Sequence, residues 1–237
     1  MENTVLKLES DGRKNLINQL YAQIDIVAVL GSLQNITIRT TSEEGIKKID
    51  SLDSESLVTR ITDLKKHIIG MQNAILGKGR VSNQEMTKNI LEFMKYRTNT
   101  DIIDSISEDD IVEIYNLDCI QIFRNFKFYE TTTYSLSDLI SFDWSELYYR
   151  PSQVSQKIQK HITAVLQNSD DSITYDMSDV PTHMIKEIKA SPIQLCEIRF
   201  KKIAPITNNI GKRTGLIVTC EAKSMLSDLS HEGIDFI

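Results

Sequence analysis

The sequence predicts an α+β protein in which an N-terminal antiparallel helical bundle precedes an antiparallel sheet that carries helices on one face. Apolar residues recur at helical spacing up to about residue 97, and alternation typical of strands begins at residue 111. Two further β-rich runs, separated by a turn-rich segment, lie near the C-terminus. With 237 residues, the chain is long enough to bury a core in one large domain or two smaller ones.

The change of pattern predicts four regions. We expect a helical dimerisation or docking domain at 1–100, an acidic connector at 101–110, a sheet domain at 111–225 and a tail at 226–237. The connector has the sequence DIIDSISEDD, and its Asp109–Asp110 pair is expected to be a solvated loop charge.

The first helix is expected over residues 13–34. Its apolar residues lie three or four positions apart and so share one helix face: Leu16, Leu20, Ile24, Val27 and Leu30. The segment after it is ambiguous, because residues 36–41 fit a short strand or an extended connector and residues 42–49 fit one or two helical turns.

The second helix has the clearest periodicity of the chain. Asp53 or Ser54 is expected to cap it, and Gly77 and Gly79 to end it. A third helix over 82–96 begins with Ser82 and Glu85 at capping-box spacing. The short turn between the two helices predicts an antiparallel hairpin. The apolar stripe of the second helix, spaced 4, 3, 4, 3, 4, comprises Leu57, Ile61, Leu64, Ile68, Met71 and Ile75.

This stripe predicts an interface. Heptad spacing favours coiled-coil contact, so we expect these six residues to bind a second copy of the chain or another partner. The alternative is that the helices pack on one another and on the sheet domain within one chain.

The C-terminal half alternates strands and helices. Strands are expected at 111–115, 119–123 and 172–177, and helices at 135–141 and 151–167. Two longer strands at 194–206 and 213–222 flank residues 207–212, whose composition is typical of a hairpin turn.

Within this half the chain resembles a PAS domain, over about residues 108–223. Its closing hairpin is carried by 203–206 and 215–218, with Gly211 in the turn. The front half of the family pattern is matched in order by Asn125, Phe128, Tyr134-Ser135, Asp138-Leu139, Trp144-Ser145-Glu146-Leu147 and Pro151. The alternative is another α+β sensor fold, such as a GAF domain.

The resemblance implies a five-stranded antiparallel sheet whose helices enclose a cleft. Such domains sense small ligands or cofactors, or act as dimerisation and protein-contact modules. The aromatic residues are either core or the lining of that cleft. The candidates for a ligand-binding cleft are Phe123, Phe128, Trp144, Tyr148 and Phe200.

Reactive groups are few. His67 is expected to be a surface residue, with a phosphoacceptor as the alternative, and His161 a helix-face residue, with a haem ligand as the alternative. Cys119, Cys196 and Cys220 are scattered through predicted strands, which is typical of reduced thiols that pack as small hydrophobes. We expect no metal and no catalytic set, and we name no cofactor beyond an unidentified small ligand.

Charge and hydropathy exclude several classes of function. A net charge of −6 argues against nucleic-acid binding, and the longest apolar run, 24–33, is too short to span a bilayer. Together with these exclusions, the resemblance to a PAS domain implies a cytoplasmic, non-enzymatic signalling protein of bacterial type. It would form a homodimer or dock to an effector such as a kinase or regulator. The alternatives are a phosphotransfer component that uses His67 and a structural adaptor with a ligand-free PAS core.

Overall fold

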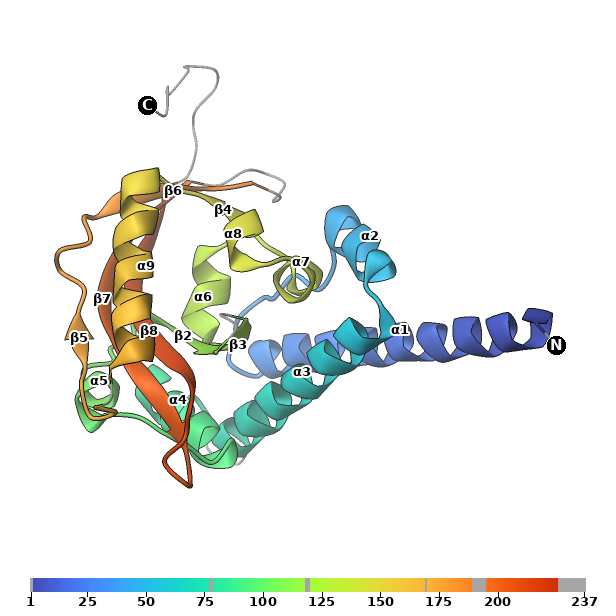
Figure 1. Ribbon diagram of the computed structural model, residues 1–237, viewed down its shortest axis with the longest axis horizontal. Coiled ribbons are helices and arrows are strands. Elements are labelled where there is room, and N and C mark those ends of the chain that lie inside the picture. The colour runs from blue at the N-terminus through green and yellow to red at the C-terminus, as the bar shows by residue number, and fades with distance from the viewer. Residues whose placement is uncertain (1, 77–78, 118–119, 169, 189–194, 226–237) are drawn as a thin grey trace, which may run out of the picture.

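The N-terminal part of the chain is helical, as its apolar spacing predicts. The computed structural model describes residues 2–76, 79–117, 120–168, 170–188 and 195–225 (Figure 1). The N-cap side chains of Asp53 and Ser82 accept hydrogen bonds from backbone amides, which fixes where two of these helices begin. The helices are α1 (Glu2–Ser32), α2 (Glu43–Ser51), α3 (Ser54–Ile75), α4 (Asn83–Phe93) and α5 (Thr100–Asp104).

Helix α3 lies between α1 and α4 and is covered by its own chain. All six residues of its apolar stripe, from Leu57 to Ile75, are between 0% and 7% exposed. They pack with the buried face of α1, which includes Leu20, Ile24 and Val27. The expectation that the stripe is an intermolecular interface is therefore corrected, because these side chains already contribute to the core of one chain. The intramolecular alternative is the one that the structure has.

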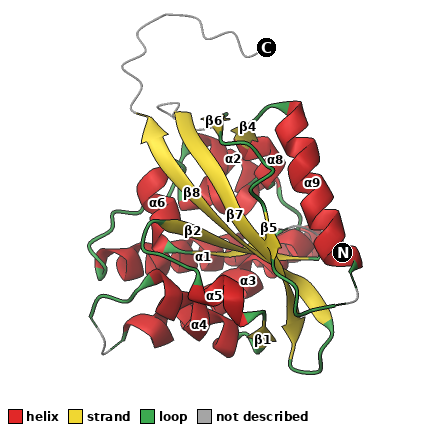
Figure 2. Cartoon of the chain, turned by 90° about the vertical axis from the view of Figure 1, so that its left-hand side faces the viewer, coloured by secondary structure: helices red, strands yellow, loops and turns green. Residues whose placement is uncertain are grey.

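A single antiparallel sheet forms the second half of the molecule. Its strands follow the order β3-β2-β8-β7-β6-β4, and two short strands, β1 and β5, pair with β7. The long β7–β8 hairpin crosses the molecule (Figure 2). The strands are β1 (Tyr96–Arg97), β2 (Asp110–Asn116), β3 (Gln121–Arg124), β4 (Tyr148–Tyr149), β5 (Tyr175–Asp176), β6 (His183–Glu187), β7 (Leu195–Asn208) and β8 (Arg213–Met225). The α+β class is confirmed.

Strands β1, β4 and β6 were not expected. Of the predicted strand at 172–177 only Tyr175–Asp176 pairs, whereas β6 lies in a segment expected to be a connection. Its signal was short but present, since His183, Ile185 and Glu187 are buried and alternate with partly exposed residues. The charged residues Lys186 and Glu187 interrupt the apolar alternation of the run HMIKE, so a prediction based on hydrophobicity does not detect this strand.

Helices α6 and α9 cover one face of the sheet, and two short helices, α7 and α8, lie between them in the described chain. The Ser135 side chain begins α7 through a capping box with Asp138, and Pro151 precedes α9. The buried face of α9 comprises Val154, Ile158, Ile162 and Val165, as its spacing predicts. The helices are α6 (Phe126–Thr131), α7 (Leu136–Ser141), α8 (Trp144–Leu147) and α9 (Ser152–Gln167).

The N-terminal helices contact the sheet as well, which corrects the expectation of helices on one face only. Helix α3 contacts β3, and α4 contacts β1 and β2. The imidazole of His67 on α3 meets the ring of Phe123 on β3 edge to face, with centroids 5.0 Å apart. Phe123 is paired across the strands with Ile114, so these two buried residues form the face of the sheet that the bundle covers.

The predicted acidic connector at 101–110 is packed. Its residues Ile102, Ile103 and Ile106 are buried. Asp110 was expected to be solvated but is 0% exposed, and its carboxylate lies 2.8 Å from Lys201 Nζ. The prediction was wrong because it considered the acidic residues of this segment and not the apolar side chains between them.

Backbone hydrogen bonds cross the expected boundary at residue 100. Leu136 N donates to Arg39 O at 2.8 Å, and Ser137 N donates to Thr40 O at 3.0 Å. Strand β1 pairs with the end of β7. The predicted tail at 226–237 lies outside the described residues. No helix in the described part of the chain is long and apolar enough to cross a membrane.

Candidate ligand-binding cavity

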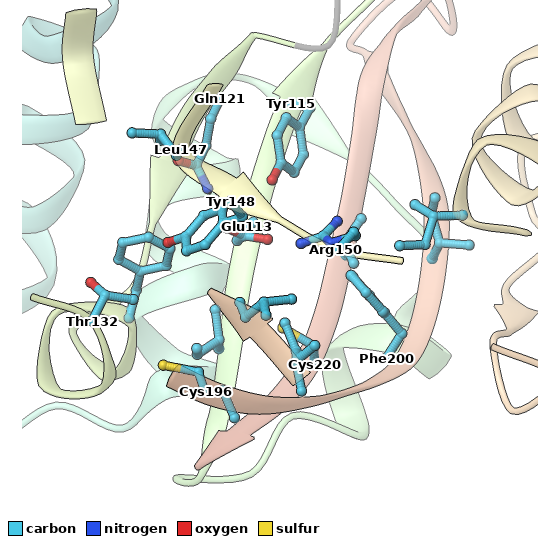
Figure 3. Close-up of a pocket in the computed structure, with 18 of the residues that line it drawn as sticks. Glu113, Tyr115, Gln121, Thr132, Leu147, Tyr148, Arg150, Cys196, Phe200 and Cys220 are labelled. Atoms are coloured by element: carbon cyan, nitrogen blue, oxygen red, sulfur yellow. Dashed lines mark hydrogen bonds between the residues drawn. The ribbon is translucent and has the colours of Figure 1, made fainter. Parts of the chain in front are cut away.

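A cavity lies between the sheet and helices α6, α8 and α9 (Figure 3). Its volume is about 70 Å³, counted as the space open to the centres of water molecules. The lining is mostly apolar, with polar groups from β2, β3, the end of α6 and the segment that follows α8. The apolar lining residues are Ile111, Phe128, Leu147, Ile158, Ile162, Met177, Ile185, Cys196, Ile198, Phe200, Ile203, Leu216, Val218, Cys220 and Ala222.

Strand periodicity decides which residues of β2 reach the cavity. Ile111, Glu113 and Tyr115 line it, and Ile114 between them lies on the face that α3 covers. A carboxylate at the middle position of this run is unusual in a buried sheet face, because burying a charge is costly unless other groups compensate it. Glu113 is therefore a residue whose position needs a local explanation.

Hydrogen bonds supply part of that compensation. Gln121 Nε2 on the neighbouring strand donates to Glu113 Oε1, and the Tyr115 hydroxyl is hydrogen-bonded to the same carboxylate. Burial raises the pKa of Glu113, and the charge of Arg124 opposes that shift. Burial and the nearby Glu113 also raise the pKa of Tyr115, so its phenol stays protonated and serves as a donor.

A cationic group completes the polar end of the cavity. Arg150 follows β4, and its guanidinium lies over the ring of Phe200 with its Cζ 5.7 Å from the centroid. Burial lowers the pKa of Arg150, but an arginine remains charged at neutral pH. Glu113 and Arg150 thus place opposite charges along one wall, with apolar side chains around them (Figure 3).

Two hydroxyl groups at the cavity have no hydrogen-bond partner within the described part of the chain. They are Tyr148 Oη and Thr132 Oγ1, and both residues line the cavity. Tyr134, whose ring meets that of Tyr148 at 5.4 Å, behaves differently. Its hydroxyl donates to Leu147 O and accepts from Ile188 N at 2.9 Å. Because an unsatisfied buried hydroxyl is costly, Tyr148 and Thr132 are the groups of this cavity most suited to bind a ligand.

The five aromatic candidates divide as follows. Phe128, Tyr148 and Phe200 line the cavity, but Phe123 lies on the opposite face of the sheet, which corrects its place among the cleft candidates. The side chain of Trp144 lies outside what the structure describes. Sequence analysis missed the polar lining residues, of which only Glu113 gave a signal, as an acidic residue inside the apolar run IVEIY.

His67 does not lie where it was expected, whereas His161 lies on the face of α9. His67 is 4% exposed rather than on the surface, and burial together with the charge of Arg124 lowers its pKa to about 3. A phosphoacceptor must be reached by the phosphoryl donor, so this position does not suit that role. His161 does not line the cavity; its Nε2 lies 2.5 Å from Asp179 Oδ1, and this position does not suit a haem ligand inside the domain.

The cysteines are buried thiols where the structure describes them. Cys196 and Cys220 lie in β7 and β8 and line the cavity as apolar surface. Burial raises the pKa of Cys196 to about 12 and that of Cys220 well above its usual value, so both are unreactive at neutral pH. Cys119 lies outside the described residues. Among those residues no group of three or more His, Cys, Asp and Glu side chains is placed to hold a metal ion.

No protein-family model matches the chain, and no curated protein matches its sequence.

Proposed function

We propose that residues 110–225 act as a PAS-like sensory unit whose cavity binds a small molecule, and that the N-terminal helices pass the signal to a partner. The observation that carries this proposal is the cavity between the sheet and α6–α9, with two buried hydroxyls on its wall that have no partner in the described chain. An antiparallel sheet with five strands longer than two residues, whose helices border a cavity, agrees with what the resemblance implies.

The lining indicates the chemical class of the ligand. Most of the wall is apolar, so the ligand buries a hydrophobic part against α9 and the β7–β8 hairpin. Tyr148 and Thr132 can each donate or accept one hydrogen bond, which calls for one polar group on the ligand. The small volume admits only a few non-hydrogen atoms unless the helices move away from the sheet.

Gln121 gives the cavity a direct connection to the helical bundle. Its side chain lines the ligand cavity and also a second, smaller cavity against α3 that includes His67 and Arg124. A ligand that engages Glu113 would compete for the hydrogen bond from Gln121. Rearrangement of Gln121 would then alter the packing of α3 on β3 and shift the population of bundle arrangements.

Helix α1 offers the surface for a partner or a second copy of the chain. Its N-terminal part extends beyond the other helices (Figure 1). Ile26 and Val29 are exposed near its C-terminal end, and Leu33, four positions further on, is exposed just after the helix. A kinase, a regulator or a second copy would bind this face rather than the α3 stripe, which is already buried.

Native mass spectrometry of the purified full-length protein tests the proposal. We expect a species heavier than the polypeptide by the mass of a small organic molecule, and loss of that species in Cys220→Leu, which fills the cavity from β8. The matched control is Ala28→Leu, which adds volume on α1 away from the cavity and should leave the retained mass unchanged.

A ligand-free packing core is the competing outcome. In that case the wild-type mass would equal that of the polypeptide, no small molecule in a thermal-shift screen would stabilise the protein, and Cys220→Leu would raise Tm by filling empty space. That combination would overturn the sensory proposal and favour a structural adaptor.

A further inference from the structure

The second cavity, between α3 and β3, contains a buried cation that the described residues leave unpaired. Arg124 on β3 is 5% exposed. Its Nη2 donates to Leu139 O at 3.3 Å, and its guanidinium packs over the ring of Phe128 with Cζ 5.2 Å from the centroid. Among the described residues, Nη1 has no hydrogen-bond partner and no carboxylate forms an ion pair with this arginine.

A second buried nitrogen without a partner belongs to the same cavity. His67 on α3 is hydrogen-bonded to the backbone of Arg124, and its Nε2 has no partner among the described residues. Both residues line a space of about 40 Å³, together with Arg60 and Asp63 of α3 and Leu139 of α7. A buried charge without a counter-ion costs several kcal/mol, so the structure needs another group here.

The charged residues around the cavity determine the sign of the charge that the missing group must carry. Arg60 at its edge has Asp143 at 3.9 Å, and Asp63 has Lys66 at 3.4 Å, so both have partners of opposite sign. Arg124 forms no ion pair among the described residues, and Glu113, the cross-strand partner whose charge it attracts, lines the other cavity. Burial is the main cause that lowers the pKa of His67, and the charge of Arg124 acts in the same direction.

From these contacts we propose that the cavity between α3 and β3 binds one small monovalent inorganic anion, of the size of a halide or nitrate, through Arg124 with Arg60 at the entrance. The single unpaired charge selects a monovalent ion, and the volume excludes larger organic anions. The bound ion connects the helical bundle to the sheet, because its ligands come from α3 and β3.

The test is thermal unfolding of the full chain at constant ionic strength while sodium chloride replaces sodium gluconate, whose anion is too large for the cavity. We expect a saturable rise in Tm, of about 3 °C once chloride exceeds its dissociation constant tenfold. Bromide and nitrate should act in the same way. The rise should disappear in Arg124→Gln and persist in Arg199→Gln, a control at an exposed arginine of the sheet.

Diffraction from wild-type crystals soaked in bromide decides the case if Arg124→Gln does not fold. An anomalous peak within reach of Arg124 Nη1 confirms the site. A Tm that is the same in gluconate and chloride, without a bromide peak, means that the cavity holds only water, and it overturns the proposal. An equal chloride effect in wild type and in Arg124→Gln would reflect general screening and would overturn it as well.

Discussion

At the scale of single residues, burial and hydrogen bonding decide which polar groups of the sheet domain support the fold and which are available to a ligand. Tyr134 and Tyr148 show this most directly, because their rings touch and only the first has a hydroxyl with partners. The stability cost of removing a buried hydroxyl depends on whether that hydroxyl is hydrogen-bonded. A hydroxyl with partners takes its hydrogen bonds with it, whereas one without partners has none to lose.

We predict that Tyr134→Phe lowers the free energy of unfolding by about 0.5–1.5 kcal/mol, because the two hydrogen bonds of its hydroxyl are lost while Ile188 N still donates to Leu147 O at 2.9 Å. Tyr148→Phe should leave stability unchanged or slightly raised, since it removes a buried hydroxyl without a partner in the described chain. Urea denaturation of ligand-free protein measures both. Equal losses in the two variants would contradict the assignment of their hydrogen bonds.

His67 gives a prediction for pH. Its pKa is about 3 in the folded protein and about 6.5 in an unfolded chain. Between these values the unfolded state binds a proton that the folded state does not, so His67 makes the protein less stable as pH falls from 6.5 towards 3. The slope from this one group is at most about 1.4 kcal/mol per pH unit.

The variant His67→Gln isolates this effect. The difference in unfolding free energy between wild type and variant should shrink with falling pH in that window. Glu113 and Glu187, whose pKa values burial raises, act in the opposite direction but are present in both proteins and cancel. Parallel stability curves for the two proteins would show that His67 is not buried in its neutral form.

At the scale of elements, local signals place the helix ends and tertiary contacts place the helices. Helix α2 lies against α7 so closely that a Cβ built on Gly45 would be 2.3 Å from Ser137 Oγ and 2.7 Å from Asp138 N. Ser42, the N-cap residue of α2, also donates to the Asp138 carboxylate. The absence of a side chain at Gly45 is therefore what permits this contact.

We predict that Gly45→Ala lowers the free energy of unfolding by about 1–3 kcal/mol, because backbone atoms of α7 cannot move aside cheaply. Gly12→Ala in α1 is the matched control. Nothing lies within 4 Å of the place that a Cβ would take at Gly12, and alanine favours a helix over glycine by about 0.5–1 kcal/mol. Thermal unfolding of both variants measures the contrast, and a stabilising Gly45→Ala would contradict the close packing of α2 on α7.

At the scale of the whole molecule, the helical bundle and the sheet share contacts across the boundary that the sequence suggests. The segment 39–42 pairs with the start of α7, β1 joins β7, and His67 packs on Phe123. Shared contacts of this kind couple the stability of the two parts, so we expect one cooperative unfolding transition.

We predict that Ile68→Ala, at a position 5% exposed in α3, costs about 2–5 kcal/mol and lowers the hydrogen-exchange protection of β8 as well as that of α3. Ile69→Ala, its neighbour at 41% exposure, should change stability by no more than about 0.5 kcal/mol. Full protection of β8 amides in Ile68→Ala would show instead that bundle and sheet unfold as separate units.

The sequence by itself determined the longer helices, because their signals are local, whereas α5, α6 and α8 were not predicted. The spacing of the α3 stripe, the caps at Asp53 and Ser82, and the apolar face of α9 depend only on residues a few positions apart. The β7–β8 hairpin was predictable for the same reason, from its turn composition and two β-rich runs.

Only the tertiary structure decided what the buried faces contact and where the polar groups meet. Heptad spacing fits a partner helix from the same chain or from another, so it could not place the α3 stripe inside this chain. The sequence also could not show that Glu113, Tyr148 and Arg150 meet at one cavity, or that His67 meets Arg124. Residues this far apart in sequence are brought together only by the strand order of the sheet. The periodicity of a sequence indicates whether a residue is buried or exposed, whereas the residues that it contacts depend on how the helices and strands pack.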